Sequence, residues 1–400
     1  MTAVWRASLW VLVGGSLILA LSLGIRHGFG LFLAPMSAEF GWGREVFAFA
    51  IALQNLIWGL AQPFTGALAD RFGAARVVLV GAVLYAVGLL CMGLADSPMT
   101  LSLSAGLLIG MGLSGTSFSV ILGAIGRAVP AENRSMAMGI ASAAGSFGQF
   151  AMLPGTLGLI GWLGWSAALL ALGLLVAMIL PLVGLLRDQP LAKQAHEQTL
   201  AEALREASLH SGFWLLALGF FVCGFQVVFI GVHLPAYLVD QHLPALVGTT
   251  VLALVGLFNV FGTYIAGWLG GRMSKPRLLT ALYLARAVVI SAFVMAPLSV
   301  WSAYAFGIAM GLLWLSTVPL TNGTVATLFG VRNLSMLGGI VFLFHQLGAF
   351  LGGWLGGYLY DRTGSYALVW QISIGLSLLA AALNWPVREQ PVARLQVSSV

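Results

Sequence analysis

Apolar runs of about 20 residues recur along the whole chain and constrain its fold more than any other feature. A helix of that length is what crossing a hydrocarbon core of about 30 Å requires. Twelve runs predict membrane-spanning helices, at residues 9–33, 46–66, 77–95, 99–126, 136–158, 166–186, 212–237, 245–270, 278–297, 301–328, 336–358 and 367–386. Only 8% of the 400 residues are charged, against about 25% in soluble globular chains. We therefore expect an all-α, multi-pass membrane protein.

Several other classes of protein are disfavoured by the sequence. The first apolar run is longer than a signal-peptide core and lacks a small-residue cleavage site, so we interpret it as a retained helix. Cys91 and Cys223 both fall inside apolar runs, which indicates buried small side chains and neither a disulfide nor a metal site. The phosphate-binding motif G-x-x-x-x-G-K-[ST] does not occur. We expect no enzyme activity, no cofactor and no ATP-driven transport.

One polar stretch divides the chain into two groups of six spans. We predict an N-terminal bundle at residues 1–187, a cytoplasmic linker at 188–211 and a C-terminal bundle at 212–400. The linker, rich in Glu, Lys, Ala, Leu and Arg, is either a short amphipathic helix on the membrane surface or a simple solvated connector.

The distribution of basic residues predicts the orientation in the membrane. With the N-terminus inside, fourteen of the 18 Lys and Arg residues fall on the cytoplasmic side, namely Arg6, Arg71, Arg76, Arg127, Arg134, Arg187, Lys193, Arg205, Arg272, Lys275, Arg277, Arg332, Arg388 and Arg394. Only Arg44 and Arg362 fall outside, while Arg26 and Arg286 lie within spans. This asymmetry follows the positive-inside rule and predicts that both termini are cytoplasmic. It also explains the net charge of +6 without nucleic-acid binding.

The two halves of the chain are related by an internal repeat. An offset of 200 or 201 residues pairs positions in three separate regions: Gly24 with Gly224, Phe29 with Phe229 and Pro35 with Pro235; Gly66 with Gly267, Arg71 with Arg272 and Arg76 with Arg277; Asn133 with Asn333, Ser135 with Ser335, Gly139 with Gly339 and Gly148 with Gly348. We therefore predict two pseudo-symmetric six-helix bundles in parallel repeat, as in carriers that rock around a central site.

The segment from Gly66 to Arg76, GALADRFGAAR, carries a family resemblance. It resembles the loop between helices two and three of the major facilitator superfamily, G-x-L-a-D-r-x-G-x-r-r, with Ala75 as a small departure. The resemblance covers essentially the whole chain and implies twelve helices and a gating loop. The gating residues implied are Gly66, Asp70, Arg71, Gly73 and Arg76, with Arg272 in the second half, where Gly271 replaces the aspartate. The simpler interpretation is a plain topogenic loop.

Arg26 is the most unusual residue of the first span. It lies about 13 Å inside the end near Pro35, where a cation costs at least about 2.5–3.5 kcal/mol. The helix containing it resembles a cavity-lining helix of the superfamily, and the repeat pairs it with Gln226. We interpret Arg26 as the anchor of an anionic substrate with Gln226 as a neutral partner; the alternative is an arginine satisfied by helix carbonyls.

Further polar residues at similar depth are weaker candidates for the substrate site. These are His345, Asn322, Asn259 and Thr116, and for each Asn or Thr an interhelical hydrogen bond is the simpler interpretation. None of the twelve acidic residues falls at mid-span, so proton coupling, if present, must use His27, His233, His345 or the substrate itself. Our candidates are His27 and His345. Arg286 is interpreted as snorkelling or structural, since the resemblance makes its helix peripheral.

The segments GIRHGFGLFL, FGWGRE and ALADRFGAAR resemble the bacterial oxalate/formate-antiporter and monocarboxylate-porter branch, and this resemblance implies a bacterial inner membrane. Thr263 replaces an arginine typical of that branch, so one cationic anchor suits a monoanion better than a dicarboxylate. We therefore predict a monomeric secondary carrier of a small organic anion, a monocarboxylate, whose other partners are membrane lipid and a proton or counter-anion. The alternatives are efflux of neutral or weakly acidic hydrophobic compounds, and a membrane sensor that transports nothing.

Overall fold

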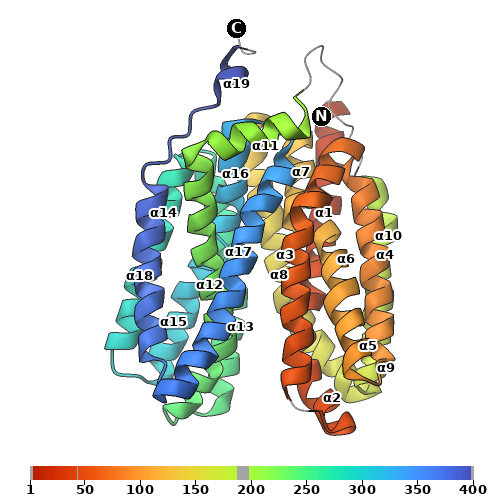
Figure 1. Ribbon diagram of the computed structural model, residues 1–400, viewed down its shortest axis with the longest axis vertical. Helices are drawn as coiled ribbons and strands as arrows, with labels where there is room; N and C mark the ends of the chain where they lie inside the picture. Colours follow the sequence, from red (N-terminus) through yellow and green to blue (C-terminus); the bar gives the residue numbers. More distant parts are fainter. Residues whose placement is uncertain (1–2, 43, 187–197, 398–400) are drawn as a thin grey trace. The chain divides into compact units, whose positions relative to one another are not determined.

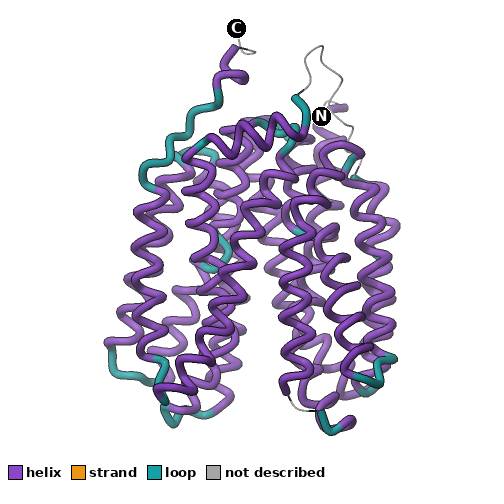
Figure 2. The backbone as a smooth tube through the Cα atoms, viewed as in Figure 1, coloured by secondary structure: helices purple, strands orange, loops and turns teal. Residues whose placement is uncertain are grey.

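A computed structural model describes residues 3–42, 44–186 and 198–397. These residues form helices and short loops, with no strand among them (Figure 2). Twelve helical stretches are long and apolar enough to span a membrane, as predicted: Ser8–Phe40, Val46–Phe72, Ala74–Gly93, Pro98–Ala128, Ala131–Leu163, Trp165–Leu185, Ser211–Asp240, Leu246–Gly270, Lys275–Met295, Val300–Phe329, Leu334–Thr363 and Ala367–Asn384. Helices prevail because only they satisfy every backbone polar group within a lipid-exposed segment.

The chain divides into two compact units. Unit 1 comprises Met1–Pro130, Ala144–Glu197 and Val331–Gly339, and unit 2 comprises Ala131–Ala143, Gln198–Gly330 and Ile340–Val400. The predicted division at residues 187 and 212 does not include the two short exchanged segments at 131–143 and 331–339. A division of the sequence into consecutive ranges cannot include such segments. The unit to which a helix end belongs depends on the residues that it contacts.

Unit 1 contains the helices coloured red to yellow in Figure 1. They are α1 (Ala3–His27), the 3-10 segment η1 (Gly28–Phe32), α2 (Leu33–Phe40), α3 (Arg44–Phe72), α4 (Ala74–Gly93), α5 (Pro98–Leu101), the π-helical segment η2 (Ser102–Leu108), α6 (Ile109–Thr116), α7 (Phe118–Ala128), most of α8 (Ala131–Leu163), α9 (Trp165–Ala177), α10 (Ile179–Leu182) and η3 (Val183–Leu185). Within this unit α4 packs along α6 and α9, and α3 packs along α6. Tyr85 and Phe32 are among its fully buried side chains.

Unit 2 contains the helices coloured green to blue (Figure 1). They are α11 (Leu200–Leu209), α12 (Ser211–Asp240), α13 (Ala245–Gly270), α14 (Lys275–Met295), α15 (Val300–Leu313), α16 (Thr317–Phe329), most of α17 (Leu334–Thr363), α18 (Ala367–Asn384) and α19 (Ala393–Val397). Here α13 packs along α15, and α14 packs along α18. Trp370, Tyr283 and Arg286 are fully buried.

Of the two predictions for the linker, a short helix or a simple connector, the helix is observed as α11. Thr199 and Glu202 form a reciprocal capping box at its first turn, which satisfies two donors that a helix N-terminus leaves open. The first part of the predicted linker, residues 188–197, lies outside the described residues, as do Arg187 and Lys193, which we placed on the cytoplasmic side.

The repeat predicted from the sequence recurs in the packing of each unit. A Cβ atom at Gly148 of α8 would lie 2.1 Å from the carbonyl oxygen of Ala20 on α1, and one at Gly348 of α17 would lie 1.9 Å from that of Phe221 on α12. In each unit, therefore, two helices approach each other closely at a glycine, and the two glycines occupy equivalent positions of the repeat. Only glycine permits such close contact between backbones.

Three local expectations are wrong. The second span continues to Phe72, so Asp70 and Arg71 lie in the last turn of α3, and the turn to α4 is Gly73 alone, at φ +89°. The fourth and tenth spans are not continuous helices, because α6 ends before Ser117 and α15 ends at Leu313. Cys91, in α4, is exposed rather than buried, whereas Cys223 is buried as expected.

Candidate functional site

Arg26 lies in the last turn of α1, where the regular helix gives way to η1. The carbonyl groups at a helix C-terminus carry partial negative charge, so this turn tolerates a cation better than a helix centre does. The Arg26 side chain donates from Nη2 to Oδ1 of Asn55, and its guanidinium carbon lies 5.2 Å from the centre of the Trp58 ring. Its Nε–H is buried and has no hydrogen-bond partner.

Both contacts of Arg26 come from α3 and are themselves held in place. The indole nitrogen of Trp58 donates to Oε1 of Gln62 and to Oγ of Ser117, each at 2.9 Å. Ser117 lies at the break between α6 and α7, and its hydroxyl also donates to Gln62 at 3.0 Å. Asn55 donates to a carbonyl of its own helix. The aromatic face opposite Arg26 is therefore fixed by a buried polar network.

The charge of Arg26 is not neutralised by an acidic side chain. No carboxylate forms an ion pair with Arg26 in residues 3–42, 44–186 and 198–397. A buried donor without an acceptor costs about 1–3 kcal/mol. An anionic oxygen that reached the Nε–H would remove this cost and pair with the cation. The sequence reasoning placed Asn55 at a depth similar to that of Arg26 but missed Trp58 as a neighbour, because tryptophan is not unusual in a membrane-spanning helix.

Thr116 connects helices in the same unit. Its hydroxyl shares a hydrogen bond of 2.8 Å with Ser22 of α1 and donates to the carbonyl of Gly112 at 3.1 Å. The side chain is fully buried. The contact with Ser22 matches the simpler interpretation, an interhelical hydrogen bond.

Arg286, the other arginine that the sequence places within a span, has very different surroundings. It is fully buried in unit 2, and its Nη2 donates to the carbonyl oxygens of Trp314 and, at 2.7 Å, of Leu313. These carbonyls lie where α15 ends, so they have no partner within the helix. Arg286 therefore caps the C-terminus of α15. Of the two interpretations of this residue, the structural one is correct and snorkelling is wrong.

Gln226 contacts Arg286. Its Oε1 accepts a hydrogen bond from Nη1 of Arg286 at 3.1 Å, and its Nε2 donates to the Ser373 carbonyl at 3.0 Å and the Ser377 hydroxyl at 2.5 Å. All its hydrogen-bonding atoms are thus used within unit 2. We therefore leave Gln226 out of the anion site, although the repeat pairs it with Arg26.

The two asparagines bind the backbone around the tenth span. Oδ1 of Asn259 accepts from the amide of Leu315 at 3.0 Å, so it satisfies an N–H at the break after α15. Asn322 donates to the carbonyl of Val318 in its own helix at 3.1 Å. The Asn259 contact agrees with the simpler interpretation, an interhelical hydrogen bond, whereas the Asn322 contact stays within α16 and tests neither interpretation.

The two histidine candidates for proton coupling differ in their surroundings. His345 on α17 is buried, with the rings of Phe220 and Phe342 at 4.8 and 5.4 Å and Oε1 of Gln346 at 3.3 Å from its Nδ1. His27 follows Arg26 and is exposed. These surroundings do not test proton transfer, which stays a prediction for both.

Asp70 is the centre of a buried ionic cluster in unit 1. Its carboxylate pairs with Arg127 of α7, and the side chains of Arg127 and Asp70 are only 3% and 1% exposed. It also accepts from the backbone amides of Ser335 at 3.1 Å and Met336 at 2.8 Å, in the first turn of α17. Gly66 allows this approach, since a Cβ there would lie 2.2 Å from the Ser335 carbonyl oxygen. Asp70 therefore caps α17 and neutralises Arg127.

The basic residues of the motif do not pair with Asp70. Arg71 and Arg76 are exposed, and the Arg71 guanidinium lies over the Phe72 ring. In unit 2, Arg272 lies in the turn after α13 and donates to the carbonyl of Trp268 in that helix. We missed Arg127 as the partner because 57 residues separate it from Asp70; the only available signal was a basic residue at the end of a span.

Comparison with known proteins shows how widely this architecture is shared. A family model described as Major Facilitator Superfamily matches residues 12–327. The chain is 25% identical over 396 residues to an uncharacterized MFS-type transporter, YcxA, of Bacillus subtilis, with 94% of each chain covered. It is 29% identical over 374 residues to mouse monocarboxylate transporter 11, covering 90% of this chain and 82% of that protein.

A solved structure has the same fold. The Escherichia coli fucose:proton symporter superposes with a TM-score of 0.73 at 15% identity, covering 96% of this chain and 98% of the symporter. At that identity the likeness concerns the fold alone.

Proposed function

Because this chain belongs to the major facilitator superfamily, we propose that it is a secondary active transporter that moves a small organic anion, a monocarboxylate, by alternating access. That it is a multi-pass membrane transporter follows from the family; the cargo and the mechanism are the proposal.

The observation that carries the proposal is the state of Arg26. It is a cation in a membrane-spanning helix, its Nε–H lacks an acceptor, and its described surroundings hold no acidic partner. Cations at this depth are rare unless they pair or line a polar path. A carboxylate of the substrate would supply both the missing acceptor and the missing charge.

The choice of a monoanion rests on how many of the arginines predicted within spans could still bind a substrate. Arg286 is the other arginine that the sequence places deep within a span, and main-chain carbonyls and Gln226 occupy its guanidinium. Arg26 then remains as a single anchor, and Trp58 offers an apolar face beside it. The similarity to mouse monocarboxylate transporter 11 supports the same class of cargo.

Asp70 is our candidate for the gate. Its carboxylate links the end of α3 to the first turn of α17, and we propose that these bonds break and re-form during alternating access. The counterpart Gly271 offers no carboxylate, so we expect a weaker link at the equivalent point of unit 2.

Transport of labelled monocarboxylates into proteoliposomes tests the proposal. A hydrogen bond to a charged group contributes about 1.5–3 kcal/mol, so Arg26→Gln should weaken apparent substrate affinity about 10-fold to 150-fold. Arg26→Lys keeps the charge and should retain part of the transport. Arg277→Gln, which removes an exposed arginine, is the matched control. Unchanged anion flux in Arg26→Gln would refute the proposal and favour transport of neutral hydrophobic compounds, whereas no flux for any cargo would favour a sensor.

We further propose a bacterial inner-membrane location with both termini in the cytoplasm, supported by the excess of basic residues on one side. A fluorescent protein fused to the C-terminus should fluoresce, and an alkaline phosphatase fusion at the same site should be inactive. An active phosphatase fusion would reverse the assigned orientation.

A further inference from the structure

A groove on unit 1 is not used by the anion site. It has a volume of about 400 Å³ and lies between α3, α4 and α6. Its walls are apolar, with Leu68, Phe72, Val80, Leu84 and Met111 among the lining residues. Leu68, Phe72 and Val80 are 48%, 43% and 59% exposed, so the groove opens to the surroundings of the helices. In a membrane-spanning unit those surroundings are lipid.

One basic side chain lines this apolar groove. Arg76 lies in the first turn of α4 and is exposed. Arg71, at the end of α3, is also exposed, with its guanidinium over the Phe72 ring. The nearby acid Asp70 is buried, and its charge is taken by Arg127. The end of the groove therefore presents positive charge that no acid in its lining offsets.

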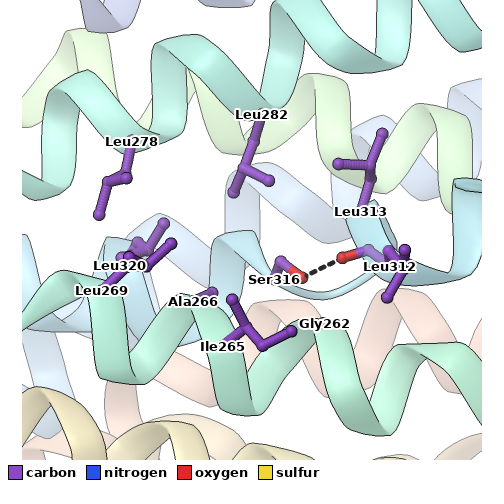
Figure 3. Close-up of a pocket in the computed structure, with 10 residues that line it drawn as sticks. All are labelled: Gly262, Ile265, Ala266, Leu269, Leu278, Leu282, Leu312, Leu313, Ser316 and Leu320. Atoms are coloured by element: carbon purple, nitrogen blue, oxygen red, sulfur yellow. Dashed lines mark hydrogen bonds between the residues drawn. The ribbon is translucent and has the colours of Figure 1, made fainter.

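The internal repeat supplies a comparison groove of different chemistry. In unit 2 a groove of about 240 Å³ lies at the equivalent place, lined by leucines such as Leu269, Leu282 and Leu312 (Figure 3). Leu282 stands where the first groove has Gly81, which explains its smaller volume. Its ten lining residues include no charged side chain, and Arg277, the repeat counterpart of Arg76, is not among them.

We propose that the groove of unit 1 is a binding site for an anionic phospholipid. One acyl chain lies along Leu68, Val80 and Leu84, and the headgroup phosphate accepts hydrogen bonds from Arg76. Burial of the chain's methylene groups contributes to binding for any phospholipid, so the arginine supplies the selectivity. The unit 2 groove lacks this cation and therefore binds the acyl chains of phospholipids with no preference for the charge of their headgroup.

The test is native mass spectrometry of the full chain, purified in detergent and mixed with equal amounts of phosphatidylglycerol and phosphatidylcholine of identical acyl chains. A basic residue attracts an anionic lipid by about 1 kcal/mol, so we expect about a five-fold preference for phosphatidylglycerol. Arg76→Gln should abolish the preference, whereas Arg277→Gln, at the equivalent position of unit 2, should keep it.

Two further experiments test whether binding requires the acyl chains and whether the lipid occupies the groove itself. Glycerol 1-phosphate, which lacks acyl chains, should not displace the bound lipid. Leu84→Trp should fill the groove and remove the retained phosphatidylglycerol, with the thermal transition of the variant as a check of folding. Equal retention of the two lipids by wild type, an unchanged preference in Arg76→Gln, or displacement by glycerol 1-phosphate would each overturn the proposal.

Discussion

Replacing Asp70 with asparagine tests the buried ionic cluster directly. The substitution keeps the size of the side chain and removes its charge. Arg127 would then remain 3% exposed without a counter-charge, and the amides of Ser335 and Met336 would donate to a neutral oxygen or to nothing. The substitution therefore measures the effect of the Asp70 charge on stability without altering the helix packing around Gly66.

The expected magnitude follows from this burial. Removing one partner of a buried ion pair costs about 3–5 kcal/mol, because the other charge stays buried and unpaired. In a unit of about 200 residues, each kcal/mol shifts the melting temperature by about 2–4 °C. We therefore expect Asp70→Asn to lower the melting temperature by about 6–20 °C.

A double-mutant cycle in detergent, followed by intrinsic fluorescence on heating, measures the effect. Asp70→Asn and Arg127→Gln should each be strongly destabilising, and the double variant should recover at least half of the sum, because the pair is removed together. Arg71→Gln, which alters an exposed neighbour, should change the melting temperature by less than about 2 °C. Additive losses in the double variant, or a small loss in Asp70→Asn, would refute the ion pair as the source of stability.

Three further predictions test other parts of the structure. Arg286→Met should leave the carbonyls of Leu313 and Trp314 without a donor and destabilise the protein by about 3 kcal/mol or more, measured by thermal unfolding; a neutral effect would contradict the capping role. Gly148→Ala should also lower the melting temperature, because its Cβ would meet the Ala20 carbonyl oxygen. The control Gly155→Ala, in the same helix with nothing within 4 Å, should be neutral or stabilising. Hydrogen bonds from Thr199 hold the pKa of Glu202 below its usual range, so the ionised carboxylate stabilises α11 near neutral pH. NMR shifts of α11 amides should move toward coil values as the pH falls through that lowered pKa in wild type, and no such pH dependence should appear in Glu202→Gln.

The sequence alone was sufficient to predict the twelve spans and the repeat. A bilayer admits lipid-exposed backbone only as helices or closed barrels, so length and hydropathy are nearly decisive. The offset of 200 residues also identified Gly148 and Gly348 as equivalent, and both lie at close helix contacts. The helix breaks before Ser117 and after Leu313 were missed, because distant side chains such as Gln62, Asn259 and Arg286 satisfy the backbone or polar groups there.

Only the tertiary structure determined which polar groups form hydrogen bonds or ion pairs with one another. Arg26 and Arg286 are alike in sequence, each a lone cation in an apolar run, yet carbonyls and Gln226 surround one while the other keeps an unpaired N–H. Asp70 likewise has basic neighbours in sequence but pairs with Arg127, 57 residues away. Hydropathy is a property of each segment and can be read locally. A hydrogen bond depends on the positions of two atoms, and those positions are set by how the helices pack.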